Sequence, residues 1–528
     1  MRFFNTTGPV KCADHYCLPP LTRIDLNEIL MLIDQKRYFV LHAPRQVGKT
    51  TYLLALMDHL NQTGRYRALY FNVEIAQSAR EEVQRAMHTI LGEMATRAQD
   101  FLKDSFLIDH WQAWLAQFSP DGVLNTALTR WAEVSPHPLV LLIDEIDSLV
   151  GDSLISILRQ LRAGYDKRPT LFPQSVILCG VRDVRDYRLH STQEKAVITG
   201  GSAFNIKAES LRLGDFSQSD VETLYQQHTQ ETGQQFEETA IELIWNLTRG
   251  QPWLVNALGY EVCFKMKGGR NRSMPISETM VLEAKENLIR RRETHLDQLV
   301  HKLNEARVRR VINPMLQGAD LDQFARQDDI QYVVDLGLVS HSEVGLQIAN
   351  PIYREVIPRE LTFITQLNFE STFRTAWYIA PDGRLEVEKL LVAFQQFFRE
   401  HSEHWVERFD YKEAGPQLLL QAFLQRIINS GGRIEREYGL GRKRTDLLVI
   451  WSYNDAVQKV VIELKLLYST LEQTLVEGLA QTWGYMDRCG VSEGHLVIFD
   501  RTEGRSWAEK IFRREEEYKG QMIHVWGM

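Results

Sequence analysis

The chain has 528 residues, which is too many for one hydrophobic core and predicts about three or four domains. With 44% hydrophobic and 25% charged residues it has the composition of an ordinary globular protein, and no apolar run approaches the ~20 residues that a membrane span requires. The net charge of −8 excludes a global basic field, so any contact with nucleic acid would have to come from local patches.

The first notable residues are cysteines near the start of the chain. Five cysteines in so long a chain, an odd number, argue against a disulfide framework. Cys12, His15 and Cys17 lie close together, but no second Cys/His pair completes four zinc ligands, so we interpret them as loop residues. No charged-then-apolar leader follows Met1, and we expect a soluble, cytoplasmic protein without membrane contact.

A loop between a strand and a helix carries the first functional signal. The apolar run Tyr38–Leu41 predicts a strand, and apolar residues recur at helical spacing between positions 53 and 60. Between them lies Ala43–Thr50 (APRQVGKT), which has the form of a phosphate-binding loop except that Ala43 stands where the pattern has Gly. A Cβ there narrows the conformations open to the loop, and we expect it to tune nucleotide affinity rather than abolish it.

This loop predicts an ATP site with Mg²⁺. Backbone N–H groups at the helix N-terminus would surround the β-phosphate, Lys49 would reach the β- and γ-phosphates, and the Thr50 hydroxyl would hold Mg²⁺. The predicted nucleotide-binding residues of the loop are Pro44, Arg45, Gln46, Val47, Gly48, Lys49, Thr50 and Thr51.

A second nucleotide signature follows the continuously apolar run Leu139–Ile143, which is typical of a strand buried on both faces of a parallel sheet. Asp144 and Glu145 come at its carboxyl end, where ligands bind in open α/β sheets. Asp144 would hold the Mg²⁺ water shell. Glu145 would orient the attacking water and accept its proton.

Further strands are expected at Ala68–Val73, Ser175–Cys179 and Phe204–Ile206, and they alternate with helical stretches. This alternation predicts a doubly wound parallel sheet, so the fold class is α/β.

Three arginines, Arg182, Arg185 and Arg188, follow the strand that ends at Cys179. Arg182 lies nearest the strand end and is the candidate to sense the γ-phosphate, or to act as a finger on a neighbouring subunit of a homo-oligomer. The alternative is a solvated loop with ordinary surface charges.

From Ser217 the pattern becomes helical, with a helix start at Ser217–Asp220 and the segment Gly250-Gln-Pro252 farther on. Together with the loop and the Asp144-Glu145 pair, this segment resembles the STAND branch of AAA-like P-loop ATPases. The resemblance implies that Pro252 lies over the nucleotide and that the surrounding helices form a moving lid. A plain junction between two helices remains the alternative.

After a basic helical stretch, Arg290–Arg310, a helix at Asp329–Leu336 is followed by a strand at Gly337–Ser340 and a second strand near Leu346–Ile348. This order is typical of a winged helix, which STAND-like ATPases often carry after the lid. Such a domain either contacts DNA or packs against the ATPase core.

Turn-forming residues at 378–384 indicate a hinge before a different kind of domain. The elements expected after it are helices at Leu385–Arg399 and 415–428, strands at Arg433–Tyr438, Thr445–Trp451 and Lys459–Leu466, a helix at Leu471–Arg488, a strand at His495–Phe499, a helix at Ser506–Arg514 and a strand at Met522–Trp526.

The predicted hairpin of this domain carries a second set of charges. Glu463 and Lys465 point to the same side of their strand, because residues i and i+2 share a face, and Asp446 can join them from the neighbouring strand. Two carboxylates and the carbonyl of Leu464 would suit Mg²⁺, and Lys465 would orient a water or stabilise phosphorane charge. Arg442 and Arg444 are placed to meet a phosphate backbone.

Gln481 and Tyr485 lie four residues apart on one face of the helix that follows. With Asp446 and Glu463-Leu-Lys465, they resemble the PD-(D/E)XK nuclease superfamily, in its RecB-type branch with a Gln-x-x-x-Tyr helix, over about residues 410–528. The resemblance implies that Asp446, Glu463 and Lys465 are catalytic and that Gln481 and Tyr485 help at DNA. It also implies an acidic residue from the first helix, for which Glu413 and Glu437 are candidates. The alternative is that Glu463 and Lys465 form a surface pair.

These signals predict five segments: a P-loop ATPase core at 1–212, a helical lid at 213–290, a winged-helix-like domain at 291–360, a helical linker at 361–410 and a restriction-endonuclease-like α/β domain at 411–528. The order resembles prokaryotic AAA-ATPase-like proteins with a nuclease tail, which implies phage defence or mobile-element biology. We expect ATP state to gate an endo- or exonuclease that acts on nucleic acid, DNA in the first interpretation, with RNA left open. The alternative is a regulatory switch whose C-terminal domain binds nucleic acid or a partner without cleaving.

Overall fold

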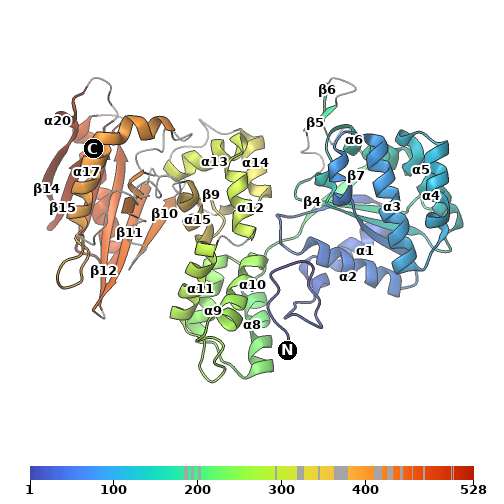
Figure 1. Ribbon diagram of the computed structural model, residues 1–528, viewed down its shortest axis with the longest axis horizontal. Helices are drawn as coiled ribbons and strands as arrows, with labels where there is room; N and C mark the ends of the chain where they lie inside the picture. Colours follow the sequence, from blue (N-terminus) through green and yellow to red (C-terminus); the bar gives the residue numbers. More distant parts are fainter. Residues whose placement is uncertain are drawn as a thin grey trace. The chain divides into compact units, whose positions relative to one another are not determined.

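The computed structural model describes the chain apart from residues 184–187, 192–195, 200–203, 292–293, 318–325, 343–344, 362–377, 409–418, 422, 425–431, 440–443, 455, 468–469, 501 and 503–504. The chain divides into two compact units (Figure 1). The first comprises residues 1–291 with 335–337, and the second comprises residues 292–334 and 338–528. Each unit has its own β-sheet and its own hydrophobic core.

A five-stranded sheet in the order β2-β3-β4-β1-β7 forms the centre of the first unit, and all its strand pairs are parallel. This confirms the predicted parallel α/β sheet. Its strands are β1 (Tyr38–His42), β2 (Arg67–Asn72), β3 (Leu139–Asp144), β4 (Ser175–Gly180) and β7 (Lys207–Arg212), and a separate hairpin is made by β5 (Arg188–Ser191) and β6 (Ala196–Thr199).

Helices cover both faces of this sheet, with α1 and α2 on one face and α3 and α6 on the other (Figure 1). Successive strand residues therefore enter different cores: Leu141 packs toward α3, whereas Leu142 packs toward α2. Because both faces of the sheet are buried, successive residues of β3 are apolar and do not alternate with polar ones. The helices are α1 (Leu26–Asp34), α2 (Lys49–Gln62), α3 (Val83–Leu102), α4 (Phe106–Gln117), α5 (Pro120–Val134) and α6 (Gly151–Ala163).

Four further helices complete the first unit: α8 (Gln218–Thr232), α9 (Glu238–Thr248), α10 (Pro252–Tyr260) and α11 (Glu278–Arg291). The helix start expected at Ser217–Asp220 is confirmed, because the Ser217 side chain and Asp220 form a reciprocal capping box. Pro252 is the first residue of α10, a position where its missing N–H costs no hydrogen bond.

The second unit begins with helices α12 (Thr294–Leu303), α13 (Ala306–Gln317) and α14 (Gln327–Asp335). An antiparallel pair, β8 (Val339–Ser342) and β9 (Gly345–Ile348), follows, and then helix α15 (Pro351–Leu361). Helix, strand, turn and strand thus occur in the predicted order, while the winged-helix interpretation itself stays a prediction.

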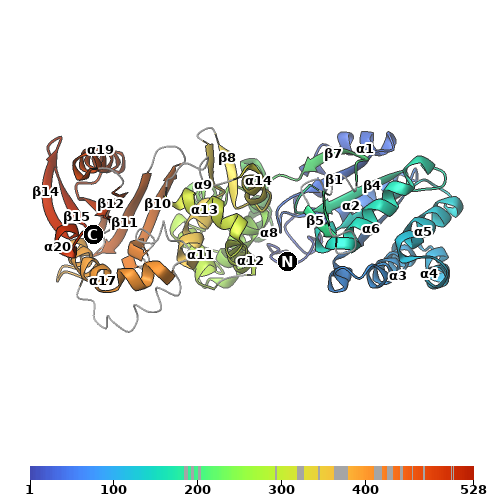
Figure 2. The same cartoon turned by 90° about the horizontal axis from the view of Figure 1, so that it is seen from above.

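A six-stranded sheet in the order β10-β11-β12-β13-β15-β14 forms the core of the second unit. Helix α19 lies on one face and α17 on the other (Figure 2). The hairpins β10-β11-β12 are antiparallel, and β13 joins β12 in parallel through α19. The elements are α17 (Val387–Arg408), β10 (Gly432–Gly439), β11 (Arg444–Tyr453), β12 (Ala456–Leu466), α19 (Leu471–Cys489), β13 (Gly494–Phe499), α20 (Trp507–Lys510), β14 (Phe512–Tyr518) and β15 (Gln521–Gly527).

Two element predictions are wrong. Phe204–Ile206 is a turn that precedes β7. The apolar side chain of Phe204 packs in the core against Tyr38, with the ring centroids 6.3 Å apart, and it does not mark a strand. The helix expected at Ser506–Arg514 ends at Lys510, and the chain continues as β14, since pairing with β15 outweighs the helical tendency of its charged residues. The helix expected at 415–428 lies mostly outside the described residues.

Candidate functional site

The loop between β1 and α2 has the backbone conformation of an anion-binding turn. Gly48 precedes the first residue of α2 with a φ of 101°, a value that glycine adopts without steric cost, and Gln46 also has a positive φ of 58°. The Lys49 ammonium is almost buried and donates hydrogen bonds to the carbonyl oxygens of Ala43 and Pro44, both at 3.0 Å. The N-terminus of α2 and this ammonium therefore face the same loop, which favours a bound phosphate.

Asp144 connects the end of β3 to this loop. Its Oδ2 accepts hydrogen bonds from the Thr50 hydroxyl at 2.7 Å and the Tyr70 hydroxyl at 3.0 Å, and its Oδ1 accepts one from the Glu145 N–H at 3.0 Å. The carboxylate is fully buried. A hydroxyl and a carboxylate oxygen in direct contact beside a phosphate loop form a donor set that fits Mg²⁺.

Glu145 follows in the left-handed conformation, with a φ of 55°, and lines the same cavity. Burial raises the pKa of Glu145 to about 7, and the Lys49 ammonium opposes that rise. The carboxylates of Asp147, Asp144 and Glu74 add to it. A carboxylate whose pKa lies near neutral pH is suited to accept a proton from water.

The cavity beside these residues has a volume of about 470 Å³, which lies within the range of small-molecule sites. Three parts of the first unit line it: the phosphate loop with the strand ends, helices α8 and α10 of the predicted lid, and residues 5–20 at the beginning of the chain. The lining residues outside the predicted set include Asn5, Thr6, Tyr16, Arg23, Tyr70, Asn72, Glu74, Phe216, Leu224, Trp253 and Asn256.

The lid wall depends on Gly250, whose φ is +78°. A Cβ at this position would lie 2.0 Å from the carbonyl oxygen of Phe216, a cavity-lining residue. The Phe216 N–H donates to the Gly250 carbonyl at 2.8 Å, so the two backbones are in direct contact. Pro252 lines the cavity, while its predicted place over a nucleotide stays a prediction.

The third wall is a segment, residues 1–20, which we call the strap. The Trp253 indole donates to the Thr6 carbonyl at 3.0 Å, and the Val10 N–H donates to the Thr51 hydroxyl at 3.0 Å. No spacing or motif in the sequence indicated this wall, because small polar residues such as Thr6 have no periodicity that links them to a distant loop.

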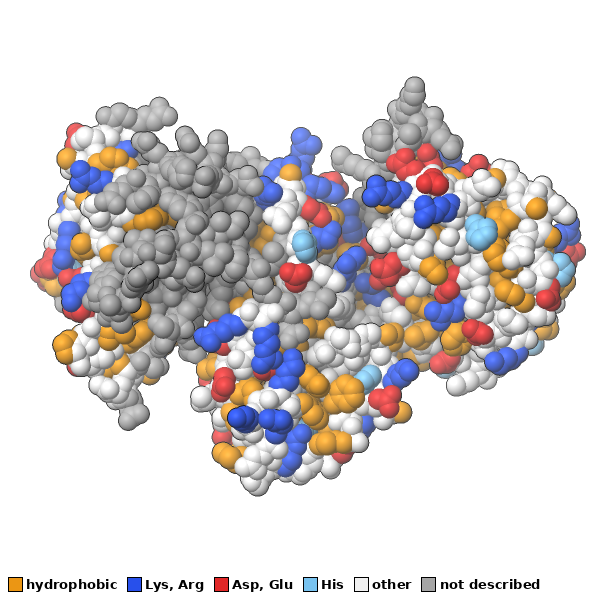
Figure 3. Space-filling model, viewed as in Figure 1, with side chains coloured by type: hydrophobic (Ala, Val, Ile, Leu, Met, Phe, Trp, Pro, Cys, Tyr) orange, Lys and Arg blue, Asp and Glu red, His pale blue; other side chains and the backbone are white. Residues whose placement is uncertain are grey.

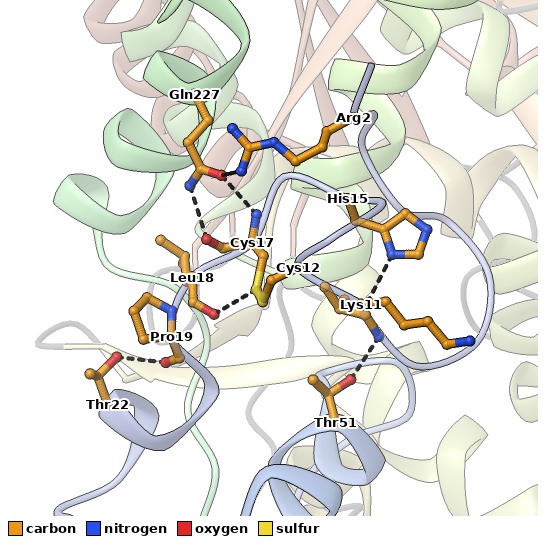
Figure 4. The surroundings of a disulfide bond; sticks show 11 residues. Arg2, Lys11, Cys12, His15, Cys17, Leu18, Pro19, Thr22, Thr51 and Gln227 are labelled. Carbon is orange, nitrogen blue, oxygen red and sulfur yellow. Dashed lines mark hydrogen bonds between the residues drawn. A yellow bond between two sulfur atoms is a disulfide. The ribbon is translucent and has the colours of Figure 1, made fainter. Parts of the chain in front are cut away.

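Cys12 and Cys17 are loop residues, as predicted, but the expectation that the cysteines form no disulfide is wrong. Cys12 and Cys17 form a disulfide within the strap (Figure 4). An odd number of cysteines argues against a disulfide framework in which every cysteine is paired. A single disulfide between cysteines five residues apart needs only a local turn, and it does not depend on the pairing of the other cysteines. Cys179, Cys263 and Cys489 are free.

Arg182 is nearly buried, and its Nε lies 3.2 Å from Oδ2 of Asp335, also buried. The alternative of a solvated surface arginine is therefore wrong for this residue, whereas its role toward the γ-phosphate stays a prediction. Arg185 lies outside the described residues.

In the second unit, the register of the hairpin places Asp446 directly opposite Glu463. Glu463 is fully buried and its Oε1 lies 2.9 Å from the Lys465 ammonium, so the two side chains share a face as predicted. Lys465 also donates to Oε1 of Gln481 on α19. The structure thus brings together Glu463, Lys465 and Gln481.

The other predicted residues of this site are placed differently. Tyr485 is buried in the apolar core under α19, with 7% of its surface exposed. Glu437 lies opposite Asp446 on β10, whereas Glu413 and Arg442 are outside the described residues, as is the side chain of Asp446. Within the described residues, no group of three His, Cys, Asp or Glu side chains is arranged to hold a metal ion.

A protein-family model described as an AAA-like domain matches residues 29–357, which is more than half of the 528-residue chain. The chain belongs to this AAA-like family. Its Lys49, Thr50, Asp144 and Glu145 all fall within the matched region. A search of curated proteins finds no match.

Solved structures similar to this AAA-like protein include a Walker-type ATPase of Pyrococcus abyssi, 15% identical, covering 67% of this chain and 99% of that one with a TM-score of 0.48. The RuvB Holliday junction branch migration motor of Thermotoga maritima is 15% identical, covers 63% and 93%, and has a TM-score of 0.33. Cdc6p of Pyrobaculum aerophilum is 13% identical, covers 66% and 93%, and has a TM-score of 0.36. At these scores the assignment rests on the family match alone.

None of the helices that the structure describes in this AAA-like protein is both long and apolar enough to cross a bilayer.

Proposed function

We propose that this AAA-like protein binds and hydrolyses ATP in the first unit, and that its nucleotide state gates a metal-dependent nuclease site in the second unit. The observation that carries the first half is the contact of Thr50 with Asp144 beside Lys49 and Glu145 in one cavity. The observation that supports the second half is Glu463, paired in register with Asp446 and in contact with Lys465.

In the ATPase site, Lys49 would exchange its two carbonyl acceptors for phosphate oxygens, which are stronger partners for an ammonium. Thr50 and Asp144 would hold Mg²⁺, which when bound neutralises charge on the phosphates. Glu145 would accept the proton of the attacking water, a role consistent with its raised pKa. Pro252 and Trp253 would cover the nucleotide from the lid, as in the STAND branch that the sequence resembles.

In the second unit, the strand order and the helix between β12 and β13 are consistent with the proposed PD-(D/E)XK fold. Asp446, Glu463 and the Leu464 carbonyl would hold a divalent ion, which when bound polarises the scissile phosphate. Lys465 would orient the attacking water, and Gln481 holds the Lys465 ammonium in place. Tyr485 of α19 is buried in the core, so in this arrangement it would support the site by packing and would not contact DNA.

DNA is the proposed substrate, although the chain is acidic overall. Figure 3 shows Lys and Arg side chains gathered over the lid helices of the first unit, so basic surface exists locally. Exposed basic residues in the segments that connect these helices are Arg249, Lys265, Lys267 and Arg270. Assembly of copies through the ATPase units, and a setting in phage defence or mobile-element biology, belong to the same proposal and rest on the resemblance.

The test combines ATP hydrolysis with cleavage of single- and double-stranded DNA by the full chain, with and without ATP. Lys49→Ala should abolish ATP binding and leave cleavage unregulated, whereas Glu463→Ala should abolish cleavage and leave ATP turnover intact. Glu477→Ala, which changes an exposed carboxylate on α19, is the matched control and should behave as wild type. Cleavage that survives Glu463→Ala would show that the nuclease assignment is wrong.

A second candidate is a STAND-type regulatory switch whose second unit binds nucleic acid or a partner without cutting. The observation that favours it is the burial of Glu463 in an ion pair with Lys465, which is an arrangement that also serves structure alone. Calorimetry with Mn²⁺ distinguishes the two, because a nuclease should show a metal site that remains in Lys49→Ala and disappears in Glu463→Ala.

A further inference from the structure

The strap is anchored in the lid. Phe4 is fully buried, and its ring contacts Tyr16 and Tyr225 with centroid distances of 4.9 and 4.8 Å. The Tyr16 hydroxyl lies 3.1 Å from Nδ1 of His228, which is also buried. The Phe4 and Tyr16 side chains are thus packed among buried side chains of α8, which fixes this part of the strap on that helix.

The strap is also attached to the phosphate loop helix. Val10 donates its N–H to Thr51, the residue after the predicted Mg²⁺ ligand Thr50. Residues 5–10 between these two attachments line the cavity. The strap therefore connects α8 to α2 along one wall of the proposed nucleotide site.

The Cys12–Cys17 disulfide links the two attached parts of the strap, because Cys12 follows Val10 by two residues and Cys17 follows Tyr16 directly (Figure 4). Cys17 lines the cavity, and its N–H and C=O are both bound by the Gln227 side chain of α8, at 3.0 and 2.9 Å. Cys12 is exposed, and the Lys11 N–H donates to Nδ1 of His15 across the same turn at 2.9 Å. Cys12 thus lies at the surface, while Cys17 is held at the cavity.

We propose that Cys12–Cys17 is a thiol–disulfide exchange site through which a small dithiol controls how tightly the protein holds its nucleotide; the proposal rests on the nucleotide site proposed above. The disulfide closes a short ring that keeps the strap folded between α8 and α2. Reduction frees this segment, so ordering it over a bound nucleotide costs more conformational entropy.

The dithiol alone supplies the electrons and protons that this thiol–disulfide exchange needs. One thiolate of the dithiol attacks the exposed sulfur of Cys12, forms a mixed disulfide and releases Cys17 as a thiolate, which takes up a proton. The second thiol then attacks the mixed disulfide, releases Cys12 and leaves the reagent as a cyclic disulfide. Two electrons and two protons pass from the reagent to the protein, and an oxidised dithiol reverses both steps.

The experiment measures ATP affinity of the full chain in the presence of Mg²⁺ by titration calorimetry, before and after treatment with dithiothreitol, with free thiols counted in both samples. Reduction should weaken ATP binding by about three- to fortyfold, the upper value being the full entropy of opening a six-residue loop. Cys12→Ser opens the ring without changing a cavity-lining side chain. It should bind ATP as weakly as the reduced protein and no longer respond to dithiothreitol.

Cys489→Ser, which removes a free cysteine of the second unit, is the control and should respond as wild type. Equal ATP affinities of the oxidised and reduced wild type would overturn the proposal, as would five free thiols in the untreated protein. This comparison needs no variant, so it stands even if Cys12→Ser does not fold. If wild type binds ATP in neither state, the nucleotide site itself is wrong and redox control is excluded with it.

Discussion

Glu145 is the residue whose environment departs most clearly from that of an ordinary carboxylate in the proposed ATPase site. It lies at the end of a buried strand, beside three other carboxylates and opposite one ammonium. Its charged form is therefore disfavoured in the folded protein, and a large part of the population is protonated at neutral pH.

This pKa predicts the pH dependence of hydrolysis. Because a protonated Glu145 cannot accept the proton of water, and its pKa is raised to about 7, kcat/KM for ATP should rise with pH, by roughly tenfold between pH 6 and 8. Steady-state ATPase assays across this range measure the change. A profile that is flat between pH 6 and 8 would contradict the role of Glu145, and Glu145→Gln should abolish turnover at every pH.

At the same scale, the sequence predicted Lys49, Thr50, Asp144 and Glu145 because each belongs to a short pattern next to an apolar strand. It did not predict Tyr70, whose hydroxyl binds Asp144, or Phe216, which lines the cavity. Each of these residues is set beside the site by the fold and lies far from it in the chain, so no local spacing marks it.

At the scale of elements, the lid depends on the junction before α10. Gly250→Ala should lower the free energy of unfolding of the first unit by about 2–4 kcal/mol and weaken ATP binding, because the new Cβ must displace the Phe216 backbone and also adopt an unfavourable φ. Chemical denaturation and calorimetry measure the two effects.

Gly122→Ala is the matched control for this substitution. Gly122 lies in the first turn of α5, and no neighbouring atom lies within 4 Å of the position that a Cβ would take there, so alanine should be neutral or stabilise by about 0.5–1 kcal/mol. Equal behaviour of the two variants would show that the Gly250–Phe216 contact does not shape the lid.

Most strands and helices were predictable from periodicity, and the errors share one cause. Phe204 is an apolar residue in a turn, and Arg513–Glu517 are charged residues in a strand. In both places a partner distant in the sequence, Tyr38 or β15, decides the conformation. The sequence did not indicate the strap for the same reason, because its position depends on contacts with α2 and α8, which are distant in the chain.

At the scale of the whole molecule, two units with separate cores predict two unfolding transitions. Saturation with ATP and Mg²⁺ at about 100 times Kd adds about 2.7 kcal/mol to the unit that binds it, which raises the Tm of a unit of this size by roughly 4–5 °C. Differential scanning calorimetry should therefore show one transition that moves and one that does not.

Lys49→Ala is the control for this measurement and should remove the ATP-dependent shift while leaving both transitions in place. A single transition that moves as a whole would contradict the thermodynamic independence of the two units.

The edge strand β14 pairs, among the strands that the structure describes, with β15 alone, and it carries five consecutive charged residues, Arg513 to Glu517. A rim of this kind is a poor template for an incoming strand, because docking would bury charges of both signs without assured partners. This edge of the sheet is thus protected against pairing with a strand of another copy, whereas the charges of β14 place no such restriction on the opposite edge at β10.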